Sequence, residues 1–135
     1  MRATPLLQKL DAVTVRVPDL DAGLRFYRDA LGHELRWRND ALGQAGLRLP
    51  GSDTELVLAT DLDYEPDWLV DSADHAAQEI CRAGGQMIAA PSDIPVGRVA
   101  VVADPFGNPL VLVDLSKGRY ETNSSGVVIG VAQDD

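Results

Sequence analysis

The chain has 135 residues, 45% of them hydrophobic, so it can bury the core of one typical domain without a disulfide framework. Its formal net charge of −9 argues against nucleic acid and anionic membranes as partners, because both would repel it. The single cysteine, Cys81, excludes an intramolecular disulfide and fits a reducing, cytoplasmic setting. We expect no signal peptide, because the N-terminus lacks an uninterrupted apolar stretch of about 7 residues or more. We expect no membrane span, since no apolar run approaches the roughly 18 residues that cross a bilayer.

The first half of the chain predicts a strand, a helix and three further strands. Alternating apolar and less apolar residues over 12–17 indicate a half-buried strand, which Pro18 ends. Asp19 is placed to cap a helix that Gly32 terminates. The apolar stripe of this helix consists of Leu20, Leu24, Tyr27 and Leu31. Extended segments separated by turn-forming residues follow near 33–38, 44–49 and 55–60.

The second half repeats this plan. An extended stretch over 65–70 precedes a helix capped by Asp71 or Ser72, and Gly84 with Gly85 ends that helix. Strands are predicted after it near 86–89, 98–103 and 110–115. An offset of 53 residues relates Val17 to Val70, Gly32 to Gly85 and Asp21 to Asp74, which indicates a weak internal duplication.

These elements predict one α+β domain over 1–135, built from two βαβββ modules over about 8–60 and 65–117. Pairing the modules would give a concave mixed sheet with helices on its outer face. Such a concavity is a natural pocket for a small molecule. The tail, 118–135, contains a short apolar run at 127–129 that could add an edge strand or close over a neighbour.

Two segments carry a resemblance to a known superfamily. VTVRVPDLDAGLRFYRDALG and, later, VADPFGNPLVLVDL are similar to the vicinal-oxygen-chelate superfamily of glyoxalases, bleomycin-resistance proteins and extradiol dioxygenases. The resemblance covers roughly residues 8–117 and implies the fold. It leaves the function open, because members catalyse unrelated reactions or none. It also implies a homodimer.

The resemblance implies four metal-ligand positions, normally His or Glu, and three of them hold residues that cannot coordinate a metal. These positions are Ala12, Val57, Glu65 and Val111. A catalytic divalent ion generally needs about three protein ligands, so one carboxylate does not hold it firmly. We therefore expect no metal and no other cofactor. If the strand register is shifted, Glu55 would join Glu65 as a ligand, because it shares a strand face with Val57.

The histidines and the cysteine add no catalytic pattern. His33 and His75 are isolated and are expected to be structural or solvated. Cys81 falls within the second helix, where a small buried thiol is the simpler interpretation. No Ser-His-Asp or Cys-His spacing is present.

Strand alternation predicts which side chains line the cleft. Trp37 either stacks on a flat ligand or, by its parity with Leu35, packs in the core. Arg48 either reaches an anionic or carbonyl group of the ligand or only solvates a strand edge. Trp68 shares parity with Val70 and is predicted to lie in the core. The expected ligand-contacting residues are Thr14, Trp37, Arg48, Glu55, Val57, Glu65, Asp67 and Val111.

Glu65 is the candidate catalytic residue. Burial among apolar side chains would raise its pKa and prepare it as a general acid or base, whereas a solvated strand-end glutamate is the alternative.

Three functions remain open. The leading hypothesis is a metal-free protein that binds a small molecule, a drug or a metabolite, with no chemistry of its own. The second is a metal-dependent lyase or dioxygenase of the glyoxalase type that uses Glu55 and Glu65. The third is a non-catalytic interaction module whose cleft is vestigial.

Overall fold

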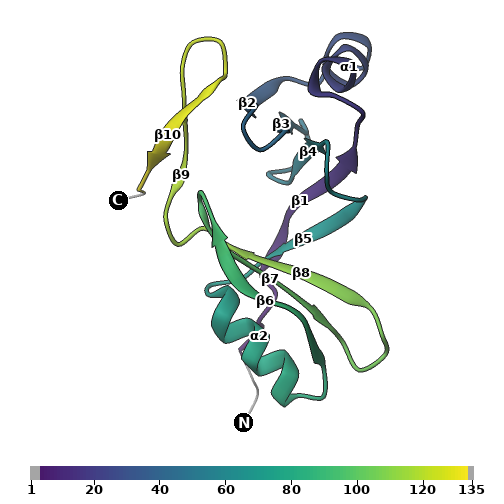
Figure 1. Cartoon of the computed structure of the whole chain (residues 1–135), viewed down its shortest axis with the longest axis vertical. Coiled ribbons are helices and arrows are strands. Elements are labelled where there is room, and N and C mark those ends of the chain that lie inside the picture. The colour runs from purple at the N-terminus through teal and green to yellow at the C-terminus, as the bar shows by residue number, and fades with distance from the viewer. Residues whose placement is uncertain (1–3, 134–135) are drawn as a thin grey trace. The chain divides into compact units, whose positions relative to one another are not determined.

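The computed structural model describes residues 4–133, which form two compact units (Figure 1). The first, called here the Trp37 unit, contains residues 11–66 and 120–130. The second, called the Trp68 unit, contains residues 67–119 and the described parts of the chain ends, 4–10 and 131–133. Within 4–133, no helix has the length and hydrophobicity needed to cross a membrane.

The Trp37 unit carries a four-stranded mixed sheet with one helical segment. Its strands are β1 (Lys9–Arg16), β2 (Leu35–Asn39), β3 (Gln44–Arg48) and β4 (Glu55–Ala59). They lie in the order β2-β3-β4-β1, with β1 and β4 parallel and the other neighbours antiparallel. Between β1 and β2 the chain forms α1 (Leu20–Leu24) and the π-helical segment η1 (Arg25–Ala30).

The helical segment begins as predicted but departs from the predicted stripe at its end. The Asp19 carboxylate accepts a hydrogen bond from the Ala22 N–H at 2.7 Å, which confirms it as the N-cap. The Leu31 N–H donates to the Phe26 carbonyl five residues earlier, so the last turn is wider than an α-helical one. This wider turn rotates Leu31 off the stripe, and its side chain is 53% exposed.

The core of this unit lies between the helical segment and one face of the sheet. Its buried residues are Val17, Leu20, Leu24, Ala45, Leu47 and Leu58, and Leu35, Leu56 and Tyr27 pack against them. Because Leu56 and Leu58 face the helix, Glu55 and Val57 occupy the opposite face of β4, as strand alternation predicted.

The Trp68 unit repeats the same topology. Its elements are the part of β5 (Glu65–Leu69) that lies in this unit, 67–69, followed by α2 (Ala73–Arg82), β6 (Gln86–Ile94), β7 (Gly97–Ala103) and β8 (Pro109–Asp114). The strand order is β5-β8-β7-β6, and β5 and β8 are parallel. Each unit therefore has the βαβββ order, and the α+β fold class is confirmed. Ser72, not Asp71, caps α2, because its hydroxyl accepts from the His75 N–H at 3.1 Å.

The core of the Trp68 unit forms beneath α2. Its buried residues are Val70, Ala73, Ala76, Ala77, Ala100, Val102 and Leu112. Trp68 packs against this cluster, which confirms its prediction as a core residue. Its indole Nε1 is buried without a hydrogen-bond partner.

Asp114, which is 3% exposed, ties α2 to β7 and β8. Its carboxylate accepts hydrogen bonds from the N–H groups of Ala73 (2.8 Å) and Arg98 (3.0 Å) and from the Ser116 hydroxyl (2.7 Å). Burial opposes ionisation of this carboxyl group, but the hydrogen bonds outweigh burial and hold its pKa below the ordinary value. Asp114 is therefore an ionised group on which three segments of the chain converge.

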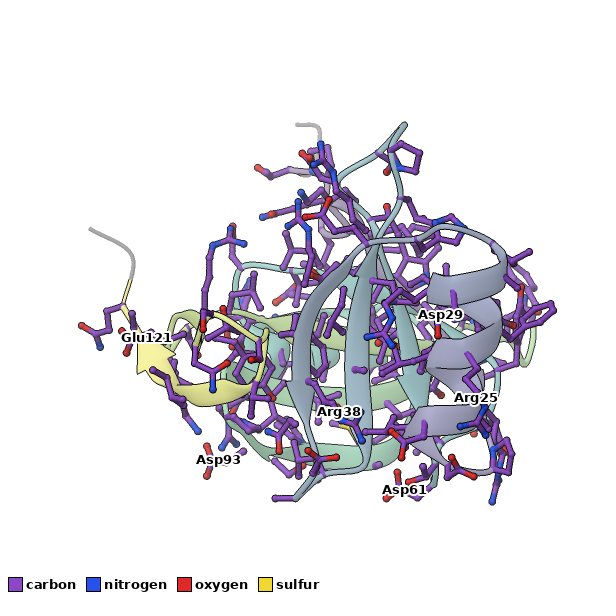
Figure 2. The ribbon with its side chains drawn as sticks, turned by 90° about the horizontal axis from the view of Figure 1, so that it is seen from above. Arg25, Asp29, Arg38, Asp61, Asp93 and Glu121 are labelled. Atoms are coloured by element: carbon purple, nitrogen blue, oxygen red, sulfur yellow. The ribbon has the colours of Figure 1, made fainter. Side chains whose placement is uncertain are left out.

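The tail does not extend the strand order of either unit. It forms a separate hairpin of β9 (Arg119–Thr122) and β10 (Val128–Ala132), at the yellow end of the colour scale (Figure 1). Val127, just before β10, makes an isolated parallel bridge to Arg38 of β2. Figure 2 shows Glu121 on this hairpin, and Arg38 beside α1, where it pairs with Asp21 at 3.0 Å.

Candidate functional site

Trp37 lies on the face of the sheet opposite to α1. The β2–β3 register places Leu35 opposite Leu47 but Trp37 opposite Gly46, so β2 has one extra residue at Arg36. In a regular strand Leu35 and Trp37, two residues apart, would point to the same face. The bulge puts them on opposite faces, so that Leu35 packs against the core and Trp37 points to the other face. The row across the four strands consists of Trp37, Gly46, Val57 and Thr14.

The Trp37 indole lies directly over Gly46. A Cβ atom at position 46 would stand 2.1 Å from the indole Nε1, so only glycine leaves room for the ring. In this position Nε1 donates a hydrogen bond of 3.0 Å to Oε1 of Glu55. The ring is thus held at a fixed orientation on the side of β3 opposite to the core, with a carboxylate at its edge.

Tyr120 from β9 packs against this indole. The two ring centroids are 4.8 Å apart with an interplanar angle of 46°. Burial raises the pKa of the Tyr120 phenol, a hydrogen bond with Asn39 lowers it, and the negative charge of Glu55 raises it; the net shift is upward. The phenol therefore stays protonated at neutral pH.

Sequence reasoning missed three members of this site: Gly46, Asn39 and Tyr120. A glycine inside a strand pattern is a signal for close approach of another group, and it could have pointed to Gly46. No local pattern distinguishes Tyr120, because its partner Trp37 lies more than eighty residues away in the chain.

The other predicted residues of the Trp37 unit fall into two groups. Thr14 (1% exposed) and Val57 (8%) stand in the same row as Trp37, and Glu55 is hydrogen-bonded to the indole. Arg48 is exposed, and its guanidinium lies 3.9 Å from the Glu34 carboxylate. It lines a surface pocket of about 410 Å³ together with Leu31, Gly32, His33, Glu34 and Pro50.

Glu65 also belongs to the Trp37 unit and is partly buried. Burial raises the pKa of its carboxyl group, and the nearby negative charge of Asp63 raises it further. The direction agrees with the expectation for a buried acid or base.

The last two predicted residues lie in the Trp68 unit. Asp67 pairs with Val111 across β5 and β8, on the face opposite to the α2 core. This row consists of Ala89, Val101, Val111 and Asp67. It corresponds to the Trp37 row, because Thr14–Val57 and Asp67–Val111 are the equivalent parallel pairs.

The residues present do not fit a catalytic divalent metal within either unit. Among the side chains described in 4–133, neither unit brings together three or more His, Cys, Asp or Glu groups. Two of the positions that the resemblance assigns to ligands, Ala12 and Val57, hold buried apolar side chains in the Trp37 unit. Glu55, the alternative ligand, uses one oxygen to accept the Trp37 hydrogen bond.

Comparison with known families and proteins identifies the relatives of this chain. Residues 9–112 match the family model of the Glyoxalase/Bleomycin resistance protein/Dioxygenase superfamily. An uncharacterised protein of Mycolicibacterium smegmatis is 37% identical over 105 residues, covering 73% of this chain and 87% of that protein. "Putative glyoxylase CFP32" of Mycobacterium tuberculosis is 37% identical over 95 residues, but the matched region is only 36% of its length.

Two solved structures show the same fold. Methylmalonyl-CoA epimerase from Mycobacterium tuberculosis has a TM-score of 0.67 and 25% identity, covering 84% of this chain and 92% of that one. A hypothetical protein from Bacillus halodurans has a TM-score of 0.67 and 21% identity, covering 85% and 98%. The resemblance noted in the sequence is confirmed, and the chain belongs to the Glyoxalase/Bleomycin resistance protein/Dioxygenase superfamily.

Proposed function

We propose that this protein reversibly binds a small molecule, a drug or a metabolite, without a metal ion. The site is the face of the Trp37 unit that carries Trp37, Glu55 and Tyr120. The observation that carries the proposal is the placement of the Trp37 indole over Gly46, away from the core, with its Nε1 fixed by Glu55. An oriented aromatic surface with one polar group at its edge suits a flat, largely apolar ligand.

Two features of the local structure support this site. The bulge at Arg36 turns the indole to the face opposite to the core, and the glycine at 46 leaves room for the ring there. Val57 and Thr14, in the same row, are almost fully buried, so the area that a ligand can cover comes from the half-buried Trp37 ring itself. A hydrophobic molecule would gain about 25 cal/mol per Å² of apolar area that it buries against this ring.

An enzyme of the same superfamily is the second candidate, and the raised pKa of Glu65 favours it. A partly buried carboxyl group with a raised pKa is a candidate for general acid or base catalysis. The metal-dependent form, a lyase or dioxygenase, would need Glu55 and Glu65 as ligands with at least one more group.

Elemental analysis separates metal-free binding from the metal-dependent enzyme. The purified protein is incubated with Fe(II), Mn(II), Ni(II), Zn(II) and Mg(II), and free ions are then removed. We expect less than about a tenth of an equivalent of each metal, because three of the four ligand positions lack donor atoms. Close to one equivalent of a single metal would contradict the proposal and make Glu55 and Glu65 the first residues to mutate.

Ligand binding is then measured in the presence of a chelator by calorimetry and by tryptophan fluorescence. The chain has two tryptophans, so the Trp68→Phe variant leaves Trp37 as the only indole fluorophore. We expect binders that change the Trp37 emission with or without chelator. Binders that appear only when metal is added would refute metal-free binding. A stable complex with another protein and no bound small molecule would favour an interaction module.

A further inference from the structure

Most of the C-terminal hairpin, 120–130, belongs to the Trp37 unit and contacts the sheet of this unit along one short line. The Tyr120 ring packs on the Trp37 indole at 4.8 Å, and the Tyr120 phenol is hydrogen-bonded with Asn39. Farther along β2, the Arg38 N–H donates to the Gly126 carbonyl at 2.8 Å. All of these contacts are made to β2, the edge strand of this unit.

Much of the hairpin is exposed, whereas Val127, Val128 and Val131 are half-buried. Residues 121–125 are exposed, and Ile129 of β10 is 67% exposed. The two strands pair only with each other in a two-stranded sheet, which has no core of its own. A segment with few buried contacts opens at a low free-energy cost relative to global unfolding.

The hairpin is nevertheless internally well formed at both ends. At the tip, the Asn123 side-chain oxygen accepts hydrogen bonds from the N–H groups of Ser125 (2.9 Å) and Val127 (3.1 Å). At the base, Gly118 approaches the Ala132 carbonyl so closely that a Cβ would stand 2.1 Å from it. The hairpin therefore holds its own shape, because the contacts that close its tip and base are separate from its contacts to β2.

We infer that this hairpin moves away from β2 when the site binds a ligand. A flat aromatic ligand then takes the place of the Tyr120 ring on Trp37. This inference rests on the proposed function. A ligand that stacks on the Trp37 indole needs the surface that Tyr120 covers, because stacked rings approach face to face. Release of Tyr120 also frees the Asn39 amide, which can then bond to a polar edge of the ligand. The Trp37–Glu55 hydrogen bond is kept in both states.

A reversible crosslink tests this directly in the full-length chain. Arg38 and Val127 are bridge partners, so the double variant Arg38→Cys/Val127→Cys can form a disulfide that pins the hairpin to β2. Cys81 is replaced by Ser to leave these two thiols alone. The single variant Arg38→Cys in the same Cys81→Ser background is the control, because it removes the same arginine but has only one thiol and forms no internal crosslink.

Binding is measured with Nile red, ethidium and 8-anilinonaphthalene-1-sulfonate, which are neutral, cationic and anionic aromatic dyes. We expect the oxidised double variant to bind at least tenfold more weakly than its reduced form, and the control to be insensitive to reductant. Tyr120→Ala should bind more tightly than the unmodified protein. Equal affinity of the oxidised and reduced forms would overturn the inference that the hairpin moves and would leave the proposed function intact.

Hydrogen exchange at the Arg38 amide gives a second readout that needs no variant. Its N–H is bonded to Gly126, so its protection should fall when the dye binds, while that of Ala45 in β3 stays unchanged. Protection that is unchanged or rises on binding would overturn the inference. Absence of binding by all three dyes to every form, Tyr120→Ala included, would overturn the proposed function itself.

Discussion

Replacing Gly46 with alanine tests the geometry on which the site depends. The new Cβ would stand 2.1 Å from Nε1 and 2.4 Å from Cε2 of Trp37, whereas nonbonded heavy atoms settle near ~3.5–4.0 Å. The indole must therefore move by more than about 1 Å. A shift of that size breaks its 3.0 Å hydrogen bond to Glu55 and disturbs its contact with Tyr120.

The size of the effect follows from these losses. A half-buried hydrogen bond to a carboxylate contributes about 1–2 kcal/mol, and an aromatic pair about 0.5–1.5 kcal/mol. Alanine in a strand regains roughly 0.5–1 kcal/mol relative to glycine. We expect the free energy of unfolding to fall by about 1–2 kcal/mol, and the Trp37 emission to shift to the red as the ring becomes more hydrated.

Urea denaturation and fluorescence in the Trp68→Phe background measure both quantities. Gly51→Ala is the matched control, because a Cβ at position 51 meets nothing within 4 Å, and its stability should change by less than about 0.5 kcal/mol. If Gly46→Ala matches this control in stability and in emission, the indole does not lie over Gly46 and the proposed site is wrong.

Two further predictions concern carboxyl groups. Asp114→Asn should lower the free energy of unfolding by about 2–4 kcal/mol in urea denaturation, because an amide cannot accept all the hydrogen bonds that converge on this buried carboxylate. Since the pKa of Asp114 is lowered in the fold, its contribution is present above the unfolded value of about 3.9 and is lost as pH falls through the folded value. A pH profile of stability below about pH 4 that is as steep in Asp114→Asn as in the unmodified protein would refute this. The pKa of Glu65 is raised in the fold, so the contribution of Glu65 to stability is present below its unfolded pKa and is lost as pH rises through its folded pKa. The free energy of unfolding of Glu65→Gln should therefore depend less on pH over this window than that of the unmodified protein. The opposite trend would count against burial as the cause of the shift. If Glu65 is catalytic, Glu65→Gln also abolishes a turnover that the unmodified protein performs, and equal rates would dismiss that role.

Local patterns predict the repeated elements of this fold well. Asp19, Gly32 and the Gly84-Gly85 pair mark helix ends through backbone requirements that depend on a few neighbouring residues. The alternation of β4 and β8 places Leu58 and Leu112 in their cores, because each strand is regular over the predicted stretch. These features depend on short-range geometry, which the sequence carries directly.

The site depends on departures from regularity, which the sequence conceals. Parity could not decide the orientation of Trp37, because a single extra residue at Arg36 reverses it and no turn former marks the bulge. A uniform helical period places Leu31 in the apolar stripe, but the wider final turn removes it from the stripe. Tyr120 reaches Trp37 only through the folding of the tail, a contact of long sequence separation.

The duplicated topology also bears on stoichiometry. Where one unit has Trp37 beside Gly46, the equivalent row of the other has Ala89 beside Val101. Val101 is equivalent to Gly46, and its isopropyl group occupies the space that an aromatic ring would need to lie over the strand. Ala89 is equivalent to Trp37 and carries no ring. The two halves are therefore alike as scaffolds and unlike as surfaces. A titration should saturate at one ligand per chain and not two, even though the backbone provides two equivalent places.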